Sequence, residues 1–119
     1  MGIKIIGTGK YLPEKVITNE DISQHVDTSH EWILDRTGIE QRRIATTESS
    51  LDMAAAAAEQ ALQGIDKDSI GLVVVATITP DNITPSMAAM VKKELGLERA
   101  IAFDINAACS GFVYGLWIA

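Results

Sequence analysis

Residues 100–111 read AIAFDINAACSG, and this stretch decides the fold class. Its first six residues are mostly apolar and predict a buried strand. Small residues surround Cys109 directly after that strand, and a helix is expected from Gly111 onward. A strand that enters a helix through a tight turn is typical of α/β folds, in which ligands bind beyond the carboxyl ends of the strands. Cys109 is therefore predicted to lie where such a fold places its chemistry.

Upstream, residues 72–75 (LVVV) are apolar throughout and predict a second strand, buried on both faces. The connection between the two strands is expected to carry a helix, with Thr84 as its N-cap, Pro85 as its first residue and Gly96 at its end. A helical crossover joins parallel strands. We therefore expect an α/β fold with a mixed, largely parallel sheet and flanking helices.

The rest of the chain gives further elements from periodicity and turn residues. They are a strand at 3–6, a short helix after Thr18 or Asn19, a helix at 28–38, an extended segment at 39–44 and a helix at 49–64. Thr28 is the expected N-cap of the second of these helices, because Glu31 follows at capping-box spacing. The helix at 49–64 carries five consecutive alanines, which indicates that it packs closely against its neighbours.

Composition excludes several classes of function. The chain has 119 residues, enough for one domain, with 10 basic and 16 acidic side chains and a net charge of −6. This charge argues against nucleic acid and anionic membranes as partners, and no apolar run is long enough to span a bilayer. The single cysteine leaves no intrachain disulfide, so a reduced, cytoplasmic setting is expected. No metal site is expected.

Cys109 is the residue best suited to carry chemistry. Its neighbours Ala107, Ala108, Ser110 and Gly111 are all small, which permits a sharp turn and lets a substrate approach the sulfur. Backbone N–H groups at a helix N-terminus favour the thiolate and stabilise an oxyanion. The alternative is a buried structural cysteine, and the local sequence does not decide between the two.

Residues 104–112 (DINAACSGF) resemble the nucleophile segment of β-ketoacyl-acyl-carrier-protein synthase III, the condensing enzyme that initiates bacterial fatty-acid synthesis. Further segments match in order and spacing, at residues 5–9, 12–13, 18–19, 27–29, 31–33, 36–39, 73–77 and 85–86. The resemblance covers essentially the whole chain. It implies the thiolase fold, with two similar halves in each subunit of a dimer. Residues 1–119 then correspond to an incomplete N-terminal thiolase-like domain, and the C-terminal half is absent.

The resemblance implies a condensing acyltransferase with Cys109 as its nucleophile. Cys109 would attack an acyl-CoA thioester and hold the acyl group until malonyl-acyl-carrier-protein, after decarboxylation, attacks it. Acyl-CoA is thus a substrate, and no cofactor is implied; the partners are malonyl-acyl-carrier-protein and a second copy of the chain. The family's catalytic histidine and asparagine come from the second half, so His25 and His30 are given no catalytic role. Asp104 is expected to order the loop before Cys109 and not to act as a base.

Substrate-binding residues also follow from the resemblance. Trp32, Arg36 and Thr37 match CoA-binding positions, with Thr28 near them. An indole stacks on adenine and a guanidinium binds phosphate, whereas the alternative is a core tryptophan beside a solvated arginine. Thr84 matches a position that helps to close the acyl pocket of the neighbouring subunit, where a bulky aromatic residue is frequent. The smaller Thr84 implies that primers longer than acetyl are accepted.

Two other interpretations stay open. The chain fits a related polyketide starter synthase that uses the same nucleophile on other starter groups, and pocket residues would distinguish the two enzymes. In a different class, these 119 residues alone are a catalytically inactive fragment that needs its complementary half to bury exposed surface. A downstream histidine and asparagine in the family's motifs would decide for the enzyme.

Overall fold

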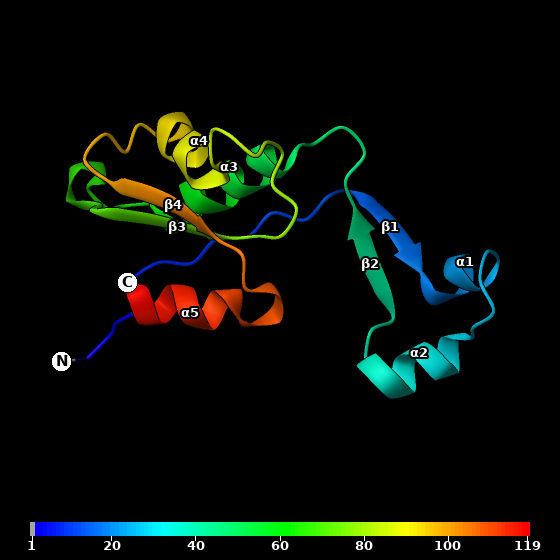
Figure 1. Ribbon diagram of the computed structural model, residues 1–119. Helices are drawn as coiled ribbons and strands as arrows, with labels where there is room; N and C mark the ends of the chain where they lie inside the picture. Colours follow the sequence, from blue (N-terminus) through cyan, green and yellow to red (C-terminus); the bar gives the residue numbers. More distant parts are fainter. Residues whose placement is uncertain (1) are drawn as a thin grey trace. The chain divides into compact units, whose positions relative to one another are not determined.

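The computed structural model describes residues 2–119, which fall into two compact units (Figure 1). The large unit comprises the described residues up to Tyr11 together with Ser49–Ala119, and the small unit comprises Leu12–Glu48. No helix among residues 2–119 is both long enough and apolar enough to cross a lipid bilayer.

The large unit is built around two parallel strands, β3 and β4, as the sequence predicts. Its elements in chain order are α3 (Ser50–Ala61), the 3₁₀ turn η1 (Lys67–Ser69), β3 (Leu72–Ala76), α4 (Met87–Glu94), β4 (Ile101–Ile105), the 3₁₀ turn η2 (Ala108–Ser110) and α5 (Gly111–Ile118). Leu72 pairs with Ile101 at one end of the ladder and Ala76 with Ile105 at the other. Helices α3 and α4 lie on one side of the strand pair and α5 lies on the other (Figure 1). The result is the expected α/β arrangement.

Alternation along β3 explains why its sequence is apolar throughout. Val73 and Val75 pack against the hydrophobic core on the side of α4. Val74 and Ala76 lie toward glycines of α5 on the opposite side. Because successive side chains of a strand point to opposite faces, a strand covered by helices on both sides has no polar face.

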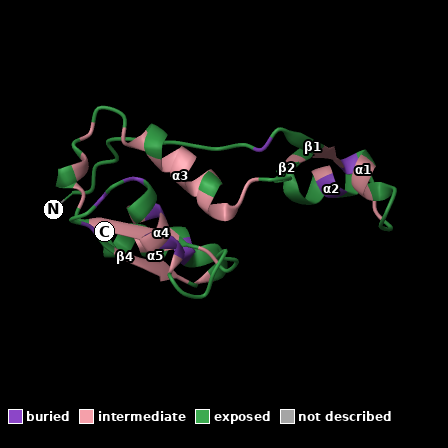
Figure 2. Cartoon of the chain, turned by 90° about the horizontal axis from the view of Figure 1, so that it is seen from above, coloured by how far each residue is buried: buried purple, intermediate pink, exposed green. Residues whose placement is uncertain are grey.

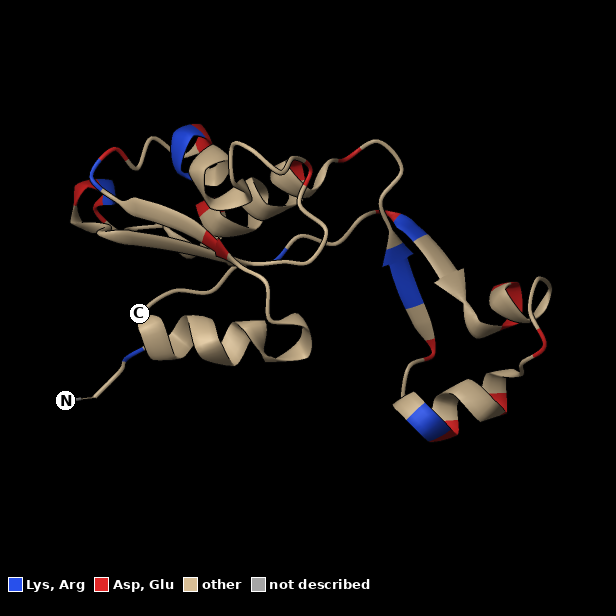
Figure 3. Ribbon diagram, in the orientation of Figure 1, with Lys and Arg blue, Asp and Glu red and all other residues tan. Residues whose placement is uncertain are grey.

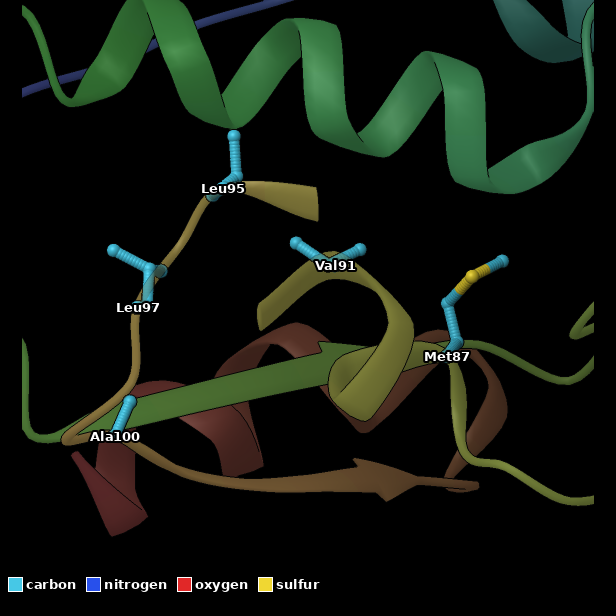
Figure 4. Close-up of a cluster of buried hydrophobic side chains, with 5 residues drawn as sticks. All are labelled: Met87, Val91, Leu95, Leu97 and Ala100. Carbon is cyan, nitrogen blue, oxygen red and sulfur yellow. The ribbon is translucent and has the colours of Figure 1, made fainter. Parts of the chain in front are cut away.

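The core of the large unit lies between α4 and the strand pair. Its buried members are Met87, Val91, Leu95, Leu97 and Ala100, shown in Figure 4. Met87 and Val91 are four residues apart on α4, and Leu95, its C-cap, continues the same face. Figure 2 shows buried residues on α4, whereas α3 is mostly of intermediate burial. Burial of each large apolar side chain contributes about 1.5–3 kcal/mol to folding.

The small unit pairs two antiparallel strands and adds two helices. Its elements are β1 (Lys15–Thr18), α1 (Asn19–Ser23), α2 (His30–Thr37) and β2 (Gln41–Ile44). The fully buried Asn19 ties them together, because its amide donates to the Ile39 carbonyl (2.8 Å) and accepts from the Arg42 guanidinium (2.9 Å). The extended segment predicted at 39–44 is thus confirmed as β2, whereas its partner β1 was not predicted.

The strand predicted at residues 3–6 is wrong, since this segment has no regular structure. The chain instead runs close to α3. A Cβ at Gly7 or Gly9 would overlap the backbone carbonyl oxygen of Ala61 or Ala57, and the Lys10 amide donates to the Gln60 side chain (3.2 Å). Among the described residues, no strand pairs with this segment. β-Branched residues favour a strand only where a neighbouring strand supplies the ladder.

Candidate active site

Cys109 lies in η2, between the end of β4 and the start of α5, as the sequence predicts. Its thiol is free and exposed, which argues against the alternative of a buried structural cysteine. The preceding Ala108 has φ = 44°, in the left-handed region that residues with a Cβ rarely adopt. The Ser110 amide donates to the Ala107 carbonyl (3.0 Å) and closes the turn. A tight, strained turn therefore carries the candidate nucleophile.

The start of α5 is fixed by close approach to β3. A Cβ added at Gly111 would lie 2.9 Å from the Cβ of Ala76, closer than two real carbons allow, whereas one at Gly115 would be 3.7 Å from Val74 Cγ1. Gly111 is buried. Only glycine lets the backbone after Cys109 come this close to the strand.

A cavity of about 770 Å³ adjoins Cys109. It is formed by α3, β3 and α5, and its lining includes Ala54, Ala58, Val74, Ala76 and Phe112. The alanines of α3 therefore line a space as well as packing against the core, and none of them is fully buried. An apolar cavity beside a nucleophile suits a hydrocarbon chain.

Asp104, the last residue but one of β4, is bonded to the start of α4. Its carboxylate accepts from the amides of Met87 (2.8 Å) and Ala88 (2.7 Å). Asp104 was expected to order the loop before Cys109, but the hydrogen bonds of its carboxylate go to the start of α4 instead. The hydrogen bonds connect the strand that leads to Cys109 with α4.

Thr84 is exposed in the loop before α4 and does not cap the helix. The N-cap is Ser86, whose hydroxyl accepts from the Ala89 amide (3.2 Å), and α4 begins at Met87. The expectation of Thr84 as cap and Pro85 as first helical residue is therefore wrong. Ser86 is also a good cap, and it stands at the position where the chain enters the helix. Thr84 is not one of the described residues that line the cavity at Cys109.

The predicted CoA-binding residues lie on and beside α2 in the small unit. The N-cap of α2 is Ser29, which accepts from the Trp32 amide (3.1 Å), so the prediction of Thr28 as the cap is wrong by one residue. The Thr28 hydroxyl oxygen is buried and makes no hydrogen bond in the structure. Trp32 is 55% exposed, so it is not a core residue of the small unit. Thr28 and Trp32 line one pocket of about 600 Å³.

Arg36 and Trp32 share a face of α2, as their spacing predicts. The guanidinium carbon of Arg36 lies 5.1 Å from the centre of the Trp32 ring, a cation–π contact. Thr37 is already engaged, because its hydroxyl donates to the Ile33 carbonyl (2.7 Å) and accepts from the Ile39 amide (3.1 Å). The helix ends at Gly38, whose φ of 68° fits the predicted glycine cap.

The electrostatics of α2 favour an anion near its start. Two hydrogen bonds hold the pKa of the Glu31 carboxyl below its usual value, the larger effect coming from the Glu31 backbone amide and the smaller from the Ser29 hydroxyl.

Residues 2–119 contain no cluster of three or more His, Cys, Asp or Glu placed to bind a metal ion. The candidate site residues form two groups. Cys109 and its cavity belong to the large unit, and the residues on and beside α2 (Thr28, Trp32, Arg36 and Thr37) belong to the small unit.

Comparison with known proteins gives one consistent result. No family model matches the chain. The β-ketoacyl-[acyl-carrier-protein] synthase III of Clostridium acetobutylicum is 50% identical over 116 residues, a match that covers 96% of this chain and 36% of that protein. Among solved structures, the 3-oxoacyl-[acyl-carrier-protein] synthase III of Aquifex aeolicus superposes with a TM-score of 0.92 at 50% identity, over 98% of this chain and 39% of that one.

A second solved structure is that of a polyketide enzyme. The priming β-ketosynthase of the R1128 polyketide biosynthetic pathway has a TM-score of 0.90 and 40% identity, over 98% of this chain and 36% of that one. The chain spans about a third of the length of the relatives it matches. In sequence and in its thiolase-like α/β fold, the chain corresponds to the N-terminal part of the β-ketoacyl-[acyl-carrier-protein] synthase III family.

Proposed function

We propose that the full-length protein carrying this chain is a condensing acyltransferase that joins an acyl-CoA primer to malonyl-acyl-carrier-protein through an acyl group on Cys109. The observation that carries the proposal is the exposed Cys109 on a strained turn beside an apolar cavity. The likeness to synthases of this name over nearly the whole chain supports it.

In the first half-reaction the Cys109 thiolate attacks the carbonyl carbon of the acyl-CoA thioester. A bond forms between Sγ and that carbon, the bond to the CoA sulfur breaks, and CoA leaves as a thiolate that takes up a proton. Backbone N–H groups at the start of the helical turn stabilise the oxyanion formed on the way. The cavity beside Cys109 receives the hydrocarbon part of the primer.

In the second half-reaction the malonyl group loses carbon dioxide, and the electron pair stays on the adjacent carbon as an enolate. That carbon attacks the acyl carbon on Cys109, a carbon–carbon bond forms, and the cysteine leaves as a thiolate. The histidine and asparagine implied by the family resemblance stabilise the enolate oxygen. We assign both to the remainder of the protein.

The small unit supplies the CoA-binding group in this proposal. The Thr28 hydroxyl is buried without a hydrogen-bond partner beside the pocket that Thr28 lines with Trp32, and in this proposal a small shift of the side chain pairs it with a polar group of the adenine ring. The exposed indole of Trp32 offers a stacking surface that already carries Arg36, whose charge suits a phosphate. The Thr37 hydroxyl is already hydrogen-bonded to the Ile33 carbonyl. In this proposal Thr37 supports the CoA-binding group by holding the end of α2 in place.

Thr84 belongs to the acyl pocket in this proposal, across the interface of a cytoplasmic homodimer. Its side chain is exposed in this chain and does not line the cavity of its own Cys109, among the residues described. A pocket of the second subunit is therefore a consistent place for it. A threonine there leaves more room than an aromatic ring, so primers longer than acetyl are accepted.

A condensation assay tests the proposal. The purified full-length protein, given acyl-CoA and malonyl-acyl-carrier-protein, is expected to release carbon dioxide and form 3-ketoacyl-acyl-carrier-protein. Cys109→Ala removes the nucleophile and is expected to abolish the condensed product, while Ser110→Ala next to it keeps the product. Condensation by Cys109→Ala at the unmodified rate would contradict the proposal.

A polyketide starter synthase is the second candidate, favoured by the likeness to the R1128 priming ketosynthase. Both candidates use the same nucleophile, so the two differ in the primer and carrier that they accept. Equal turnover with the carrier protein of a fatty-acid synthase and with that of a polyketide synthase would leave both roles in place. Turnover with the polyketide carrier alone would assign the chain to the second.

A further inference from the structure

The loop between β3 and α4, residues 77–86, is held at two places by aspartate carboxylates. Asp81, inside the loop, accepts from the amides of Ser50 (3.1 Å) and Leu51 (2.8 Å) at the start of α3. Asp104, on β4, accepts from the amides of Met87 and Ala88 directly after the loop. Each carboxylate uses both oxygens on two consecutive N–H groups.

These carboxylates are additional to the ordinary helix caps. Ser49 already caps α3 by accepting from the Asp52 amide (3.1 Å), and Ser86 already caps α4. The aspartates take the remaining N–H groups of each first turn, where a negative charge is favoured. They therefore join elements that are distant in sequence, and hydrogen bonds to a charged group are the stronger kind.

The tip of the loop has little else to hold it. Ile83, next to Thr84, is 97% exposed, so burial within this chain does not fix its position. The Asn82 amide lies 3.5 Å from the sulfur of Met90, a weak contact. Asp81 stands three residues before Thr84 and Asp104 binds the chain three residues after it. The position of Thr84 thus depends on two anchors, one on each side.

We propose that Asp81 and Asp104 are positioning residues that fix the loop tip and, through Thr84, set the length of acyl group that the enzyme accepts. The specificity role rests on the proposed function, in which Thr84 closes an acyl pocket. Asp104 also belongs to β4, the strand that leads to Cys109. Its hydrogen bonds therefore connect the end of the loop to the strand that carries the nucleophile turn. Neither aspartate touches the reacting atoms in this proposal.

The test compares Asp81→Ala with Ser49→Ala in the full-length protein. Both substitutions remove a hydrogen-bond acceptor from the first turn of α3, but only Asp81→Ala also releases the loop. The melting temperatures of the two variants report how far each destabilises α3, so Ser49→Ala is the matched control. Amide hydrogen exchange at Ser50 and Leu51, whose N–H groups donate to Asp81, is expected to rise about tenfold in Asp81→Ala and to stay unchanged in Ser49→Ala, which leaves both of these hydrogen bonds in place. Equal exchange in the two variants would overturn the anchoring.

The specificity role is read from kcat/KM for a series of acyl-CoA primers. The ratio between a long and a short primer is expected to change at least about threefold in Asp81→Ala, to stay constant in Ser49→Ala, and to recover in Asp81→Glu, which keeps the carboxylate. A loosened loop with an unchanged ratio would overturn the positioning role. Absence of turnover in the unmodified protein contradicts the proposed function instead, and the exchange comparison still decides the anchoring.

Discussion

At the scale of single residues, the geometry around Cys109 comes from its small neighbours. The run of small side chains predicted a sharp turn after β4, and the structure places one there. The sequence did not indicate which residue takes the left-handed conformation. It is Ala108, although the glycine that usually adopts it stands three positions later at Gly111. Gly111 is needed for close packing against β3, and the strained left-handed conformation of the turn is adopted by Ala108.

Ala108→Gly is expected to stabilise the protein. Removing the Cβ relieves a left-handed conformation that costs an alanine roughly 1–2 kcal/mol, and this exceeds the entropy that glycine adds to the unfolded chain. Ala107→Gly is the control, because Ala107 has φ = −137° and gains nothing. Urea unfolding should give a higher free energy of unfolding for Ala108→Gly and a lower one for Ala107→Gly. The reverse order would refute the strained turn.

At the scale of elements, predictions succeeded where local pattern and tertiary partner agree. β3, β4 and α5 are strongly apolar; β3 and β4 pair with each other, and α5 packs one side against β3. The strand expected at residues 3–6 has an equally apolar sequence but no paired strand among the residues described. Helix caps were misplaced by one or two residues because cap-forming residues are adjacent, Thr28 beside Ser29 and Thr84 near Ser86. Asp81 carried no local signal, since its partners lie about thirty residues away.

Gly111→Ala is expected to disturb α5. The new Cβ would meet the Ala76 Cβ, which has no freedom to move aside, so overpacking should cost about 1–3 kcal/mol of unfolding free energy. Gly115→Ala makes an ordinary contact with Val74 and gains helix propensity, so it should be neutral or stabilising by up to about 1 kcal/mol. Chemical denaturation of both variants decides. Equal effects would show that α5 does not approach β3 through Gly111.

On α2, Trp32→Ala and Arg36→Ala are expected to raise KM for acyl-CoA several-fold with little change in kcat, because both groups bind the substrate away from the reacting carbon. Steady-state kinetics of the full-length protein measure this. Asp35→Ala, exposed on the same helix, is the control and should keep KM unchanged. Variants at Trp32 and Arg36 with unaltered KM would remove CoA binding from α2.

At the scale of the whole molecule, α5 shows that residues 1–119 leave apolar surface open. Figure 3 shows no charged residue on this helix, and Phe112 and Trp117 are 70% and 86% exposed. A helix that is apolar on all sides is normally buried. Because the relatives are about three times as long as the matched region, we expect the remainder of the protein to cover α5.

Residues 1–119 expressed alone are therefore expected to bind the dye ANS strongly and to show no condensing activity. The full-length protein should bind less dye, because α5 is then covered, and should be active. Trp117→Glu in the isolated chain is a useful comparison, since it should lower dye binding by reducing the exposed apolar area. Full activity of the isolated chain, or dye binding equal to that of the full-length protein, would contradict this account.

The most direct test of the acyl-cysteine mechanism is mass spectrometry of the full-length protein after incubation with acetyl-CoA. We predict one added acetyl group per chain, on the peptide that contains Cys109, and none in Cys109→Ala. Peptide mapping locates the adduct without any need for the second half-reaction. An acetyl adduct that persists in Cys109→Ala, or one that maps to another residue, would show that Cys109 is not the nucleophile.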